Sequence, residues 1–184
     1  MTTLTKTLLF FSCALVLTVS AAAQQRDPLN DVESDELREV AQEPDKRLKL
    51  MIKFTGERLD TVEEALKDTD PKGRGMRIHD ALQDFRELVD ELDDNIDDFV
   101  QKQEDLRKPL GEIIAAEENY DKRLKAIQER AQDPKLAEEY KQYSFVLQDA
   151  VEAVNLSLED AKKTLEEQKA AMAEEKQKEK EKKK

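Results

Sequence analysis

The residues best suited to chemistry are carboxylates, which crowd a stretch of nine positions that begins at Asp90. Asp93 and Asn95 fall at the first and third positions of an EF-hand calcium loop. Such a loop needs glycine at its sixth position, because the chain turns sharply there, and Asp98 occupies that position here. A helical apolar pattern also runs through the whole stretch. We therefore expect a continuous helix here and no EF-hand.

Without a loop, the same stretch could still hold a divalent cation on one helix face, since carboxylate oxygens are the ligands such cations prefer. The candidate ligands of such a site are Asp90, Asp94, Asp97 and Asp98. The favoured interpretation is a solvated acidic face that pairs with basic residues of a neighbouring helix. We therefore expect no bound metal and no cofactor.

The other reactive residue types are too few to build a catalytic site. His79 is the single histidine, and it stands beside Asp80. The single cysteine, Cys13, lies in an apolar leader. Zinc sites and thiol chemistry need several such ligands or a nucleophile with its base, and no serine has an obvious base partner. We expect no catalytic residue and predict that the chain is not an enzyme.

The element that would position these side chains is a long apolar seam. Its members fall three and four residues apart, which is typical of a coiled-coil helix. The pattern predicts one helix of about 57 residues, from Gly75 to Ala131. Gln103 and Glu117 are the polar residues of the seam, and we interpret them as residues that set helix register. The apolar members include Ile78, Leu82, Phe85, Val89, Leu92, Ile96, Phe99, Leu106, Leu110, Ile113, Tyr120, Leu124 and Ile127.

Pro109 lies inside this predicted helix. Proline removes a backbone hydrogen bond and clashes with the preceding turn, so we expect a bend near Pro109. The unbroken phase of the seam on both sides favours one bent helix. A reversal of the chain near Pro109, which would give a four-helix bundle, remains open.

Two turns divide the rest of the chain. The stretch 70–75 is rich in Pro and Gly, and Asp133 with Pro134 has the pattern of a helix start. Helices are predicted at about 31–69, 75–131 and 135–175, followed by a Lys- and Glu-rich tail over 176–184. The predicted fold is all-α: a long three-helix antiparallel coiled-coil bundle, with 31–175 as its domain.

Antiparallel pairing of the predicted helices indicates which of their residues should lie side by side. Arg47 should lie beside the acidic stretch, and Lys162 beside Glu104. The flanking helices would each cover only part of the central helix, which leaves an open groove near each end. Such open heptad seams could take a protein partner or a second copy of the chain, so a homodimer is a possible assembly.

The first residues resemble an export signal. A weakly basic start is followed by an apolar run and by small residues before Gln24. We predict a cleaved signal peptide over 1–23 and a linker over 24–30, which would make the protein periplasmic or secreted. An uncleaved anchor is the alternative. If the leader is cleaved, we expect no membrane span in the rest of the chain.

The net charge of −12 makes nucleic-acid binding improbable, because an acidic surface repels phosphate. High charge, few aromatics and helical periodicity indicate a coiled coil or helical bundle. The predicted function is an exported non-enzymatic scaffold, adaptor or chaperone-like protein-binding module of the cell envelope. The alternative is a divalent-cation-binding bundle that uses the acidic face Asp90–Asp98.

Overall fold

The computed structural model describes residues 26–131 and 133–182, and these fold as helices without a strand. The predicted signal peptide, 1–23, lies outside the described residues. The long helices are α2 (Pro44–Lys67), α3 (Arg74–Gln101), α4 (Arg107–Arg130) and α6 (Ser144–Lys182). The short elements are α1 (Asp31–Glu39), the 3-10 turn η1 (Pro134–Leu136) and α5 (Ala137–Tyr140). The all-α prediction is confirmed.

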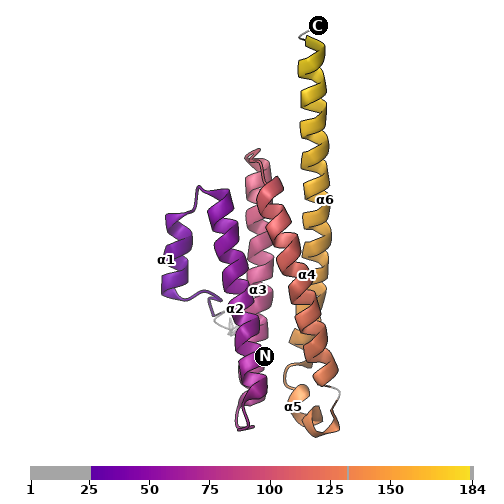
Figure 1. The fold of residues 1–184 in the computed structure, drawn as a ribbon. Coiled ribbons are helices and arrows are strands. Elements are labelled where there is room, and N and C mark those ends of the chain that lie inside the picture. Colours follow the sequence, from indigo (N-terminus) through magenta and orange to yellow (C-terminus); the bar gives the residue numbers. More distant parts are fainter. Residues whose placement is uncertain (1–25, 132, 183–184) are drawn as a thin grey trace, which may run out of the picture.

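The four long helices pack side by side as a bundle (Figure 1). Helix α2 packs against α3 and α4, and α6 packs against α4 and α3. Consecutive long helices run in opposite directions, so α3 and α6 are parallel. Ser157 lies beside Asp93, and Gln168 lies beside Glu104; both pairs are separated by 64 residues.

The expected central helix of about 57 residues is wrong as a single element, because α3 ends at Gln101 and α4 begins at Arg107. The helix ends in a Schellman motif, with the backbone N–H of Glu104 donating to Phe99 O (3.1 Å) and that of Gln103 to Val100 O (2.9 Å). Gln103 adopts the left-handed conformation this motif requires, with φ of 61°. Five residues are therefore enough for the reversal that the sequence left open.

Pro109 takes part in a helix start and does not bend a continuous helix. It occupies the third position of α4, where a backbone N–H has no partner within the helix in any case. Gln168 of α6 closes the turn from the other side. Its Oε1 accepts from the backbone N–H of Leu106 (2.8 Å), and its Nε2 donates to Glu104 O (3.0 Å).

The predicted pairings are partly right. Arg47 does lie beside the acidic helix, where its Nε donates to Asn95 Oδ1 and its Nη2 lies 4.0 Å from Glu91 Oε1. Lys162, however, pairs with Glu118 at 2.9 Å and not with Glu104. The second reversal is longer than a simple turn, because η1 and α5 are inserted in it, and this shifts the register of α6.

The open grooves expected at the seam ends are also wrong. Phe85 and Val89 are at most 1% exposed, and Tyr120 and Leu124 at most 4%. These side chains form one apolar core because α4 folds back between α2 and α6. Any partner of this protein must therefore use another surface.

Helix α1 lies alongside α2, outside the bundle of four long helices (Figure 1). Asn30 caps it, since its side chain accepts from the backbone N–H groups of Val32 and Glu33. Arg58 of α2 forms an ion pair with Glu33 (Nη2–Oε2 2.5 Å) and donates to Pro28 O (2.7 Å). Leu37 is buried in an apolar cluster that it shares with residues of α2, α3 and α4. Arg47 Nη1 of α2 also donates to Leu37 O (2.8 Å), so two arginines and one apolar contact hold α1.

Candidate functional site

A buried polar cluster lies in the middle of the bundle, where α3, α4 and α6 meet. Glu117 of α4 and Ser157 of α6 are fully buried, and Asp93 of α3 is half-buried. Ser157 Oγ lies 2.5 Å from Asp93 Oδ1 and within hydrogen-bond distance of Glu117 Oε1. Glu117 Oε2 is buried and has no hydrogen-bond partner among the described residues.

This geometry needs a proton on one carboxyl group. A serine hydroxyl carries one hydrogen and can donate to only one of two carboxylates. Burial raises the pKa of Glu117 to about 8, and the negative charge of Asp93 adds to this effect. Burial also raises the pKa of Asp93, to about 6, against the hydrogen bond from Ser157. A protonated Glu117 therefore donates to Ser157, and Ser157 donates to Asp93.

The four candidate cation ligands do not converge on one point. Asp90 pairs with Arg86 (2.6 Å) within α3, and Asp98 pairs with Lys102 (2.8 Å), the residue that follows α3. Asp97 lines a separate pocket of about 300 Å³ between α3 and α6, together with Asp93 and Lys163. Asp94 is exposed. Within the described ranges, no group of three or more His, Cys, Asp or Glu residues is placed to hold a metal ion.

His79 lies near the start of α3 and is half-buried, with Nδ1 3.2 Å from Asp80 Oδ1. This agrees with the predicted histidine beside a carboxylate. The other polar seam residue, Gln103, lies exposed in the turn between α3 and α4. Neither residue belongs to the buried cluster.

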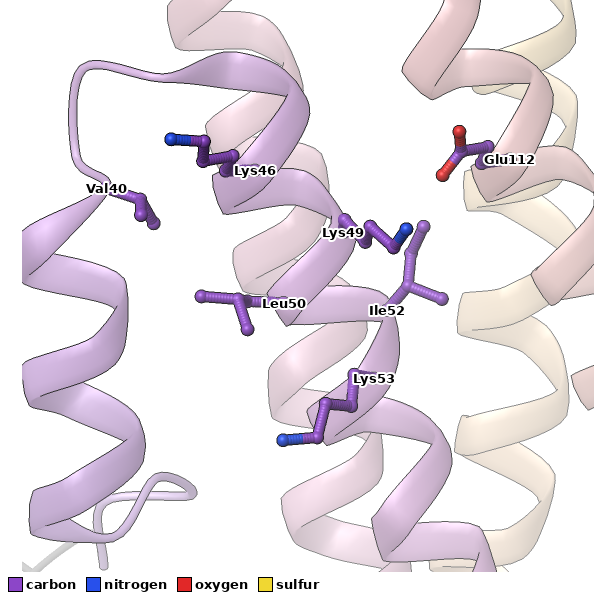
Figure 2. A pocket seen from close by; sticks show the side chains of 7 residues that line it. All are labelled: Val40, Lys46, Lys49, Leu50, Ile52, Lys53 and Glu112. Atoms are coloured by element: carbon purple, nitrogen blue, oxygen red, sulfur yellow. The ribbon is translucent and has the colours of Figure 1, made fainter.

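An apolar hollow lies on the outer side of α2, between the end of α1 and α4 (Figure 2). Its volume is about 650 Å³. Val40, Leu50 and Ile52 supply its branched apolar side chains, and all three are only half-buried. Residues 46, 49, 50 and 53 lie three and four apart, so they form one stripe along α2.

The rim of this hollow, which we term the lysine pocket, is basic although the chain is acidic. Lys46, Lys49 and Lys53 line it, with Glu112 as the one acidic lining residue. Lys46 pairs with Glu43 at 2.5 Å, and Lys53 lies 3.8 Å from Glu57. Lys49 has no ion-pair partner in the described part of the chain. Its ammonium group is therefore available to an anion from solution.

A second exposed feature is the end of α6. Gln168 contacts the turn between α3 and α4. Beyond Gln168 the helix continues alone, well past the rest of the bundle (Figure 1). We call residues 169–182 the α6 arm. It carries apolar side chains at 170–173, followed by mixed Lys and Glu, with Lys178 lying 3.8 Å from Glu174.

Sequence reasoning found some of these features and missed others. Glu117 stood out as a carboxylate in an apolar seam, and its burial follows from that position. Ser157 and Asp93 were not joined to it, because their contact depends on α3 and α6 being parallel neighbours. The lysine pocket was also missed, although the spacing of Lys46, Lys49, Leu50 and Lys53 was a readable signal for one helix stripe.

Comparison with known proteins identifies no relative. No protein family, no curated protein and no solved structure matches this chain. In the part of the chain that the structure describes, no helix is both long enough and apolar enough to cross a membrane. The function proposed below therefore rests on residues of this chain alone.

Proposed function

We propose that this chain is an exported, non-enzymatic helical scaffold, adaptor or chaperone-like module that binds a protein partner in the cell envelope. The observation that carries the proposal is the α6 arm (169–182), a helical segment that extends beyond the other described helices of the bundle (Figure 1). The leader supports export, since it has the composition of a signal peptide.

The side chains of the arm are suited to packing against a helix of a partner protein. Ala170, Ala171 and Ala173 are exposed and small, so another helix could approach the backbone closely, and Met172 adds an adaptable apolar side chain. Lys and Glu then alternate toward the tip, and such a mixture can set the register of a paired helix at modest energy. The occupant we propose is a helix of a different protein.

The test compares the full chain with a chain that ends at Gln168. Because the arm extends beyond the bundle, both forms should unfold at the same temperature. A photoreactive cross-linker at Met172, used in cells of the source organism, should give one discrete adduct with a second protein. The same cross-linker at the exposed Ala126 of α4 is the matched control.

Three results would contradict the proposal. The Met172 adduct could match the Ala126 adducts, which would indicate random collisions. It could consist of two copies of this chain, in which case the arm is a dimer contact and light scattering would show a dimer that is lost on truncation. The truncated chain could also unfold at a lower temperature, which would make the arm part of the fold.

A further inference from the structure

We propose that the lysine pocket between α1, α2 and α4 binds a long-chain fatty acid, with the carboxylate at Lys49 and the acyl chain over Val40, Leu50 and Ile52. The site lies on a different face of the molecule from the α6 arm and does not depend on the function proposed above. The inference combines the shape of the hollow, its apolar floor and the ammonium group of Lys49 on its rim.

The floor of the pocket can hold an acyl chain but offers few polar partners. Val40, Leu50 and Ile52 are half-buried, so each keeps apolar surface in contact with water. The methylene stems of the three lysines extend this surface, because lysine places its stem along apolar groups and its ammonium in water. The volume of about 650 Å³ falls within the range typical of small-molecule sites.

The charges on the rim of the lysine pocket favour a ligand with a negative charge. Lys46 and Lys53 have carboxylate partners on or next to their own helix, whereas Lys49 has none among the described residues. Figure 2 shows the Lys49 side chain directed toward the α4 side of the hollow, close to Ile52. An ammonium group beside an apolar surface recognises a molecule with one negative group and one apolar tail.

Peptides and membranes fit this site less well. An amphipathic helix needs apolar anchors over several turns, at i, i+3 or i+4 and i+7, whereas only Val40, Leu50 and Ile52 supply branched apolar side chains here. Binding to a bilayer surface would require a broad basic face, whereas the chain carries a net charge of −12. A single-chain amphiphile matches both the size and the charge of the pocket.

The test is a calorimetric titration of the purified chain with sodium oleate, kept below its micelle concentration. We expect saturable binding of one oleate per chain. Lys49→Gln should weaken binding about tenfold, which is the loss of one charge-assisted contact. Glu112→Gln should bind oleate equally well or more tightly, because it removes a negative charge from the rim. Lys122→Gln is the matched control, since Lys122 is an exposed lysine of α4 outside the pocket.

Several outcomes would overturn the proposal. Binding that does not saturate, or that Lys122→Gln weakens as much as Lys49→Gln, would indicate diffuse attraction. If oleyl alcohol bound as tightly as oleate, Lys49 would not recognise the carboxylate. A chain that binds vesicles of anionic phospholipid and ignores monomeric oleate would recognise a lipid surface. Leu50→Gln tests the floor independently, and unchanged oleate affinity in that variant would also refute the site.

Discussion

Replacing Glu117 by glutamine should remove a pH-dependent loss of stability. The folded chain holds Glu117 protonated up to a pKa of about 8, whereas its ordinary pKa is 4.5. The folded state therefore binds one proton more than the unfolded state between these two values. Stability from this site is fully present below about pH 4.5 and falls as the pH rises toward 8.

The size of the effect follows from the same two values. Each pH unit within this interval costs about 1.4 kcal/mol, so ionisation of Glu117 costs about 5 kcal/mol in total. Asp93 adds to the pH dependence of stability only below its own folded pKa of about 6, because above that pH its carboxyl group is ionised in both the folded and the unfolded chain. Between about pH 6.5 and pH 8 the slope therefore belongs mainly to Glu117, and the wild-type chain should lose about 2 kcal/mol there.

The Glu117→Gln variant keeps the shape of the site and has no proton to lose. The new amide can donate to Ser157 Oγ, as the protonated carboxyl group of Glu117 does. The variant should match the wild type within about 1 kcal/mol near pH 5, and exceed it by about 3 kcal/mol near pH 8. Urea unfolding followed by far-ultraviolet circular dichroism at several pH values measures both slopes.

The matched control is Glu118→Gln, one residue along α4. Glu118 is exposed and pairs with Lys162 at 2.9 Å, so its replacement should leave the pH slope of the wild type in place. A wild-type stability that stays level or rises between about pH 6.5 and 8 would refute the reasoning. An equal slope in wild type and Glu117→Gln would show that another group carries the proton.

Three further changes test the fold. Gln103→Gly should stabilise the chain by about 1 kcal/mol in thermal or urea unfolding, because glycine adopts the left-handed conformation without a clash; a loss of similar size would indicate a continuous helix at this position. Gly111→Ala should raise stability by about 0.5–1 kcal/mol, since no side chain beyond its two chain neighbours lies within 4 Å of the added methyl group in α4, and unchanged or lower stability would contradict that local packing. Arg58→Met should loosen α1 at a cost of about 3 kcal/mol, because it leaves the buried Glu33 carboxylate without its cation, while Arg47 and Leu37 still hold the helix. Hydrogen exchange should then accelerate in α1 and not in α3; equal acceleration in both would show that Arg58 stabilises the whole bundle.

The sequence was sufficient to predict helices and their apolar faces, because periodicity follows directly from which side of a helix is buried. The apolar residues of the seam are indeed buried, from Ile78 through Ile127. The sequence was insufficient to place the reversal after Gln101, because the seam keeps its phase across the turn. A five-residue turn that contains a non-glycine left-handed residue has no strong sequence signal. The register of α6 was missed for a related reason, since η1 and α5 lengthen a reversal that reads as a simple turn.

The two polar residues of the seam point to a more general lesson. Gln103 and Glu117 invited one shared interpretation, as residues that set register in a coiled coil. In the structure, the two positions are polar for different reasons. Gln103 is polar because the helix ends there and its side chain lies in solvent, whereas Glu117 is buried and is bridged by Ser157 of α6 to the carboxyl group of Asp93 in α3. The two residues differ in the burial of their side chains, and the burial of Glu117 depends on the long-range packing of α6 against α3 and α4. A polar residue in an apolar seam therefore marks a place where the simple pattern fails, and only the tertiary fold shows whether that place is a turn or a buried site.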